Sequence, residues 1–177
     1  MDWIDTLMLE SQRGKITAEG RLPAINAHVE TTHALSARLI AVQGISLIHV
    51  NGSTREEISS ALELLRGFRA TGRRIVMCDT ATLVAGRQLG RELVDAGTAD
   101  TVITSGSSGR DLAIGARDAG LDLSNVVVCR DTTAASEVLT CRLVPGDTVL
   151  IWGVEPQVCD RLVTVLEKRY PSPAPAA

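Results

Sequence analysis

The stretch from Arg73 to Asp111 constrains the fold most, because it joins two strand-like runs through one amphipathic segment. Residues 74–78 and 101–104 show no alternation, which is typical of strands buried on both faces of a parallel sheet. Between them apolar residues recur about every three to four positions, and Gly97 suits a left-handed helix end; these are Leu83, Val84, Leu89, Leu93 and Val94. Strand, crossover helix and strand form a βαβ unit with parallel strands, so the centre of the chain is α/β.

A hairpin is predicted ahead of this unit. Residues 38–42 and 45–50 are rich in strand formers and are separated by Gln43-Gly44, which indicates a tight turn. Thr54 followed by Glu57 fits a capping box, and the helix that it begins is expected to reach about Ala70. Downstream the patterns predict helices over 109–119, 132–139 and 155–170, a third buried strand over 125–129 and another strand over 148–152.

The expected fold is therefore an α/β, Rossmann-like three-layer sandwich. Its sheet is mostly parallel, has about six strands and carries the N-terminal β-hairpin at one edge. This domain is expected to span residues 36–170.

Both ends of the chain fall outside this pattern. Residues 2–13 predict a helix that docks on its own domain or on a partner, because one helical face carries apolar side chains; these are Trp3, Ile4, Leu7 and Met8. Residues 15–35 lose periodicity and are predicted to be irregular, with a short helix near His33. The proline-rich tail, 171–177, is predicted to be disordered.

Composition excludes several kinds of partner. Aromatic residues make up 2% of the chain, the net charge is -3 and no basic cluster is present, which argues against a nucleic-acid partner. No secretory signal or membrane-length apolar window is visible, so we expect a cytoplasmic protein without a membrane partner. No CxxC motif occurs, so the cysteines predict no zinc site or redox pair and are expected to be small core residues; they are Cys78, Cys129, Cys141 and Cys159.

Candidate ligand-binding residues follow the predicted strands. In open parallel sheets ligands bind at the carboxyl ends of the strands. The residues expected there are Asn51, Asp79, Ser105, Gly106, Ser107, Ser108, Gly153 and Glu155. No metal site and no catalytic residue is predicted, because His28 and His33 lack metal-ligand spacing and no Gly-x-Ser-x-Gly elbow is present.

Each of these candidates has a structural alternative. The loop 105–109 precedes a helix and suits an anion, but it lacks a P-loop lysine and the three-glycine dinucleotide fingerprint, and it equally fits a simple helix cap. Asp79 is placed to orient a substrate amine or a metal-bound water, or to cap the next turn. His49 is an acid–base candidate or a hydrogen-bonded, half-buried residue.

Several segments, taken in order, carry a family resemblance. Residues 143–153 read Leu-Val-Pro-Gly-Asp-Thr-Val-Leu-Ile-Trp-Gly, and they follow strand-like segments at 38–49, 75–79 and 100–105. In this order the segments resemble the C-terminal domain of the Mur ligases, the ATP-dependent amide-bond ligases of peptidoglycan precursor synthesis, and most closely the branch that adds D-Ala-D-Ala. The corresponding family motif is Leu-x-Pro-Gly-Asp-x-Val-Leu-Val-Lys-Gly. The resemblance covers residues 36–169.

The chain departs from the family at its ligand-binding motifs. The family's Asn-Ala-Asn-Pro is replaced by Asn51-Gly-Ser-Thr-Arg55, and its Lys-Gly-Ser-Arg becomes Trp152-Gly-Val-Glu155. Two cations are therefore lost and an anion stands in their place, which turns attraction for a phosphate into repulsion of a few kcal/mol, on the order expected in a partly shielded cleft. Asp79 and the Pro145-Gly-Asp147 turn are kept. The family's ATPase domain and P-loop are missing from the sequence.

Three functions follow as expectations. The first is a stand-alone domain that binds a partner or a small ligand of peptidoglycan precursor synthesis and forms no amide bond alone, with no cofactor of its own. The second is a substrate-binding part that works with a separate ATPase domain or cell-wall synthesis protein, which would bring ATP and Mg, while Asp79 and Asn51 position the amino-acid substrate. The third is an unrelated α/β protein that binds a nucleotide or phosphate at loop 105–109.

Overall fold

The computed structural model describes residues 16–21, 24–30, 36–52, 54–68, 70–81, 86–95 and 97–170, with only the backbone described for 16–30. Its strands are β1 (Ile16–Arg21), β2 (Ala24–Glu30), β3 (Ser36–Val42), β4 (Ile45–Val50), β5 (Arg74–Asp79), β6 (Thr101–Ser105), β7 (Val126–Val128) and β8 (Thr148–Trp152). Its helices are α2 (Arg55–Gly67), α3 (Gly86–Asp95), α4 (Gly109–Asp118), α5 (Thr132–Arg142) and α6 (Pro156–Arg169), with a short 3-10 turn, η1 (Leu123–Asn125).

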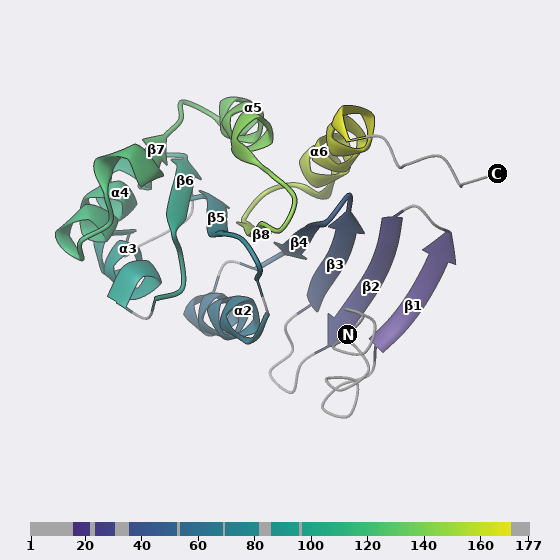
Figure 1. Ribbon diagram of the computed structural model, residues 1–177. Helices are drawn as coiled ribbons and strands as arrows, with labels where there is room; N and C mark the ends of the chain where they lie inside the picture. Colours follow the sequence, from purple (N-terminus) through teal and green to yellow (C-terminus); the bar gives the residue numbers. More distant parts are fainter. Residues whose placement is uncertain are drawn as a thin grey trace.

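The strands form one sheet in the order β1-β2-β3-β4-β8-β5-β6-β7 (Figure 1). The first four strands are antiparallel neighbours, whereas β4, β8, β5, β6 and β7 pair in parallel. One core cluster lies under α2, α3 and α4, and a second lies under α5 and α6. Helices therefore cover both faces of the parallel part, and the predicted α/β, Rossmann-like three-layer sandwich is confirmed.

The irregular structure predicted for residues 15–35 is wrong where the chain is described. Residues 16–21 and 24–30 form β1 and β2, which extend the hairpin outward and make the sheet wider than the predicted six or so strands. The overlooked signal is alternation, because Ile25, Ala27 and Val29 interleave with polar residues. The predicted helix over 2–13, the helix near His33 and the tail 171–177 lie outside the described residues.

The strand predicted over 125–129 is present but is not buried. It is the last strand in the sheet order and pairs only with β6, and Val128 is 50% exposed. An unbroken apolar run predicts a strand with two covered faces, but the sequence does not say how many neighbours that strand has.

The local signals are confirmed at three places. Gln43 and Gly44 both have positive φ, 51° and 77°, which is the backbone of a type I′ hairpin turn between β3 and β4. Thr54 and Glu57 form the reciprocal capping box of α2, although the helix ends at Gly67 and not near Ala70. Gly97, with φ 59°, follows α3 in the left-handed conformation. These signals fix the geometry with which the chain enters and leaves the parallel strands.

Candidate functional site

Four of the predicted ligand-binding residues form one row at the carboxyl edge of the parallel strands. The sheet register pairs Val50 with Trp152, and Trp152 with Cys78. One position further along, across β4, β8, β5 and β6, the row reads Asn51, Gly153, Asp79, Ser105. Neighbouring strands lie about 4.8 Å apart, so this edge row spans about 14 Å. The topology thus gathers residues that are far apart in the sequence.

Asp79 uses both carboxylate oxygens to hold loops at this edge. Oδ1 accepts a hydrogen bond from the Ala81 amide at 3.0 Å, and Oδ2 accepts one from the Thr132 hydroxyl at 2.7 Å. The first bond closes an Asx turn, which confirms the turn-capping alternative for Asp79. The second ties β5 to the start of α5. Sequence reasoning missed Thr132 because nothing local marks a bond between residues 53 positions apart.

The loop after β6 is fastened to the loop after β5. The carbonyl oxygen of Ser105 accepts hydrogen bonds from the Thr80 amide at 2.9 Å and the Thr80 hydroxyl at 2.6 Å. Gly106 has φ 87°, and a Cβ atom there would lie 2.5 Å from Asp79 Oδ1. Only glycine suits this position. Ser107 is exposed, and its hydroxyl reaches the Ala81 carbonyl at 3.4 Å.

The start of α4 lacks a side-chain cap. Ser108 is the N-cap residue, yet its side chain makes no capping hydrogen bond, and the first turn closes through the Ser108 carbonyl and the Leu112 amide at 3.1 Å. The simple-cap alternative for loop 105–109 is therefore not supported by a capping side chain.

Ser105 carries a second unusual group. Its side-chain hydroxyl is fully buried and has no hydrogen-bond partner among the described residues. Ser105 and Asp79 are register partners in β6 and β5, so their side chains leave the sheet on the same face. An unpaired buried hydroxyl costs about 1–3 kcal/mol. Ser105 therefore places this unfavourable free energy within the edge row.

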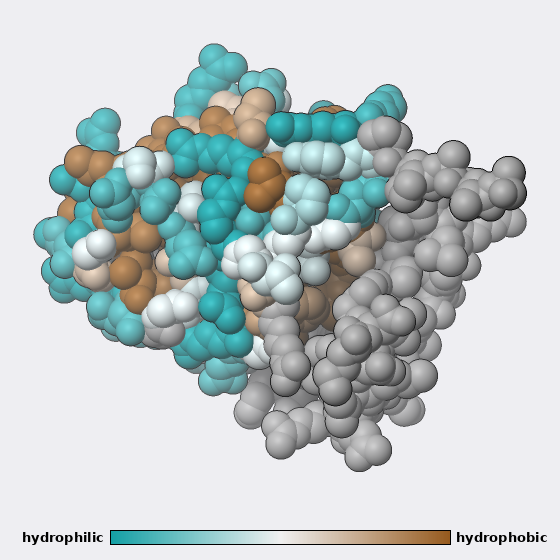
Figure 2. Space-filling model, viewed as in Figure 1, coloured by the Kyte–Doolittle hydropathy of each residue, from teal (hydrophilic) through white to brown (hydrophobic). Residues whose placement is uncertain are grey.

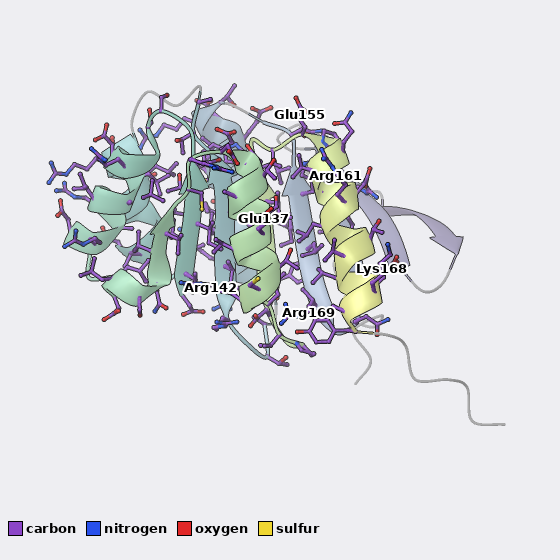
Figure 3. All side chains as sticks on the ribbon, turned by 90° about the horizontal axis from the view of Figure 1, so that it is seen from above. Glu137, Arg142, Glu155, Arg161, Lys168 and Arg169 are labelled. Atoms are coloured by element: carbon purple, nitrogen blue, oxygen red, sulfur yellow. The ribbon has the colours of Figure 1, made fainter. Side chains whose placement is uncertain are left out.

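The remaining candidates differ in their closeness to Asp79. Gly153 has φ 67°, and a Cβ atom there would lie 2.7 Å from the Asp79 carbonyl oxygen. The backbone directly after β8 therefore lies in close contact with the end of β5. Asn51 is exposed and lies two strands away from Asp79. Glu155 is exposed at the N-cap of α6, and Figure 3 shows its side chain at the outer end of that helix.

Trp152 and His49, which lie on β8 and β4 just before the edge row, have structural roles. Trp152 is buried, and its indole Nε1 donates a hydrogen bond to the Gly52 carbonyl at 2.5 Å, which fastens the loop after β4. His49 is buried, and its Nε2 lies 2.8 Å from the Val154 carbonyl. The structure supports the hydrogen-bonded alternative for His49, but the side chain is fully buried and not half-buried as predicted.

Arg130 is a cation at the same carboxyl edge of the sheet as the edge row. Arg130 follows β7 by two residues, and its side chain is 85% exposed while its Nε lies 2.9 Å from a carboxylate oxygen of Asp131. Its place directly after the strand predicted over 125–129 already puts Arg130 at the carboxyl edge in the sequence.

The cysteines divide into two groups. Burial raises the pKa of Cys78 to about 12 and that of Cys159 to about 11, so both thiols stay protonated and act as core side chains. Cys141 is exposed, so the core prediction is wrong for this residue, and Cys129 is only partly buried. The part of the chain that the structure describes contains no group of three or more potential metal ligands, and none of its helices is long and apolar enough to cross a membrane.

Comparison with known proteins shows similarity in structure alone. No protein-family profile and no curated protein matches the sequence. A domain from a protein designated a UDP-N-acetylmuramate:L-alanyl-γ-D-glutamyl-diaminopimelate ligase of Haemophilus ducreyi superposes with a TM-score of 0.54 at 16% identity, covering 71% of this chain and 94% of that domain. MurF from Acinetobacter baumannii gives a TM-score of 0.54 at 10% identity, covering 84% of this chain.

A UDP-N-acetylmuramoyl-L-alanyl-D-glutamate–2,6-diaminopimelate ligase gives a TM-score of 0.55 at 10% identity over 88% of this chain. The match spans 45% of the length of each of these two ligases. The described chain therefore has the fold of a domain found in Mur ligases.

Proposed function

We propose that this chain is a ligand-binding domain of the Mur ligase type, linked to peptidoglycan precursor synthesis, and that it does not form an amide bond by itself. The single observation that carries this proposal is the edge row of Asn51, Gly153, Asp79 and Ser105, which lies at the edge where open parallel sheets bind ligands. The shared fold supports the link to Mur ligases.

We infer that the chain forms no amide bond alone because side chains at this edge are engaged in structural hydrogen bonds or carry negative charge. Trp152 stands where the family motif has lysine, and its indole is used to fasten a neighbouring loop. Glu155 adds negative charge beyond the row, which disfavours a transferring phosphoryl group. Asp79 is held by two hydrogen bonds and serves as a fixed wall of the site.

A second candidate is a substrate-binding part that acts together with a separate ATPase domain, most like the branch that adds D-Ala-D-Ala. It is favoured by the retained Asp79 and by the exposure of Asn51, which leaves an amide free to contact an amino-acid substrate. ATP and Mg would then be bound by the other subunit. This candidate predicts binding of the precursor or dipeptide, and no binding of nucleotide, by the chain alone.

Thermal unfolding of the purified chain tests the proposal. Mg-ATP, Mg-ADP, a UDP-muramoyl peptide and D-Ala-D-Ala are each titrated, since a ligand at 100 times its Kd stabilises the native state by about 2.7 kcal/mol. We expect a shift with the muramoyl peptide that is reduced in Asn51→Ala and Ser107→Ala. Both side chains are exposed, so neither change should alter the fold.

The matched control is Ser59→Ala, an exposed serine on α2 away from the edge row. It should bind like the native chain. A shift with nucleotide alone would favour the phosphate-binding alternative at loop 105–109. No shift with any of the four compounds would refute ligand binding at this edge.

A further inference from the structure

An open groove separates the two helices on the α5–α6 face of the sheet. It has a volume of about 280 Å³ and is lined from α5 by Thr133, Ser136, Glu137, Thr140 and Cys141, and from α6 by Val158, Arg161, Leu162 and Val165. Val165 is 46% exposed. Figure 2 shows apolar surface among polar residues along the upper side of the molecule, where Figure 1 places these two helices.

The walls of this groove are unusually poor in charge. Glu137 and Arg161 are the only charged residues among the nine that line it. The groove between α2 and α3 is a useful contrast, because four of its six lining residues are charged; they are Glu63, Arg66, Glu92 and Asp95. Depletion of charge at the centre, with charges kept at the margin, is typical of a surface that another molecule covers.

The two charges of the α5–α6 groove are opposite in sign, one on each wall. Glu137 makes no hydrogen bond or ion pair among the described residues, and Arg161 uses Nε for the Gln157 carbonyl at 3.3 Å without pairing with a carboxylate there. Each is the sixth residue of its helix, and Figure 3 shows both on the half of the helices nearer Glu155. They therefore lie at similar levels on the two walls.

We infer that the α5–α6 groove is the contact surface for a second copy of this chain. A two-fold axis running along the groove lays α5 of one copy over α6 of the other. Because Glu137 and Arg161 lie at similar levels, the same operation sets Glu137 against the partner's Arg161, and it does so twice. Val158 and Val165 are covered in the same step. A single surface carrying both charges is thus complementary to itself, and this contact is independent of ligand binding at the edge row.

Charge-reversal variants test this arrangement. The native chain should sediment as an increasing fraction of dimer from low micromolar to near-millimolar concentration. Glu137→Arg or Arg161→Glu alone sets like charges against each other at both contacts, and we expect dimerisation to weaken by at least about tenfold. An equimolar mixture of the two variants restores both opposite-charge contacts, so it should form a heterodimer about as tightly as the native chain.

The controls separate this surface from others. Glu63→Arg reverses an exposed charge on α2, away from the α5–α6 groove, so it should leave the dimer unaffected. At a concentration low enough to keep every chain monomeric, circular dichroism and the melting temperature should be unchanged in every variant, because both groove charges are exposed. The inference is overturned if the native chain stays monomeric throughout, if either single variant dimerises like the native chain, or if the mixture gains nothing over its components.

Discussion

The helix pairs α3–α4 and α5–α6 lie on opposite faces of the same sheet and are packed in different ways. In the first pair glycine lets the backbones touch, because a Cβ atom at Gly90 would overlap the Leu112 carbonyl oxygen and one at Gly115 would overlap the Arg87 carbonyl oxygen. In the second pair none of the nine residues that line the space between the helices is glycine, and a groove remains. The identity of a few packing residues thus decides which helix pair is in close contact and which pair leaves a groove.

Among the described residues, hydrogen bonds between the α5 and α6 regions lie near the carboxyl ends of the two helices. The Tyr170 hydroxyl donates to the Leu143 carbonyl at 2.8 Å, and Arg169 donates to the Thr140 carbonyl. Asp147 fixes the turn that follows α5 by accepting hydrogen bonds from the Val144 amide at 3.1 Å and from Arg73 at 2.7 Å. These contacts set the spacing of α5 and α6 without closing the groove.

The largest effect on stability is expected from a substitution that forces α3 and α4 apart. Gly90→Ala places a methyl group where the backbone of α4 lies, so α3 and α4 must separate, and we expect a loss of about 3 kcal/mol in the free energy of unfolding. Urea denaturation measures it. Gly97→Ala is the control, because nothing lies within 4 Å of its Cβ position and only the left-handed backbone is strained, at about 1 kcal/mol. Equal losses would show that the α3–α4 contact is not special.

Removing the charge of Asp147 should loosen the anchor of α5. Burial raises the pKa of Asp147, but hydrogen bonds from Arg73 and the Val144 amide outweigh it and hold the pKa below the usual value. We expect Asp147→Asn to cost about 1.5–3 kcal/mol at neutral pH, the range for hydrogen bonds to a charged group.

The pH dependence of the same variant follows from the lowered pKa. The unfolded chain protonates Asp147 more readily than the folded chain, so its stabilisation is complete above about pH 4–5 and is lost as pH falls through the lower, folded value. The native chain should therefore lose its advantage over Asp147→Asn below about pH 4. A stability difference that does not change between neutral and acid pH would contradict the assigned role of this carboxylate.

A smaller effect is expected at the joint between α5 and α6. Tyr170→Phe removes the hydroxyl that bonds the Leu143 carbonyl and should cost about 1 kcal/mol in thermal or urea unfolding. Thr164→Ala removes a hydroxyl that bonds only within α6, to the Asp160 carbonyl, and should change stability by less than about 0.5 kcal/mol. If both changes have the same effect, the Tyr170 bond does not join the helices.

The smallest effect on stability is expected from the exposed ion pairs between α3 and α4. Hydrogen bonds from Arg87 and Arg91 lower the pKa of Asp118, but the cluster is open to solvent. Asp118→Asn should shift the melting temperature only slightly, and the shift should vanish in high salt because exposed ion pairs are screened. A large or salt-resistant shift would mean that charge, and not glycine packing, holds α3 against α4.

The parts of the fold that were predictable are those with local causes. The hairpin turn at Gln43-Gly44, the capping box at Thr54 and the βαβ unit each follow from a few neighbouring residues. The edge row was also predictable, because a parallel topology brings strand ends together whatever their sequence separation. The alternation in β2 was present in the sequence but short, and it was overlooked.

The hydrogen-bond partners of individual side chains were not predictable. Asp79 bonds Thr132 across 53 residues, and Trp152 bonds Gly52 across 100. Such bonds depend on the final placement of loops and leave no periodic trace. The groove between α5 and α6 is a gap that arises from side-chain sizes on two helices, so it becomes visible only when both are packed on the sheet.

Amide chemical shifts distinguish most directly between ligand binding at the edge row and self-association at the α5–α6 groove. The UDP-muramoyl peptide is titrated into the 15N-labelled chain at a fixed protein concentration. We predict that the amides of Asn51, Ser107 and Gly153 move, while those of Thr140 and Val165 do not. Shifts confined to the groove residues, or no shifts at saturating ligand, would contradict the central claim that this Mur-type fold binds its ligand at the carboxyl edge of the sheet.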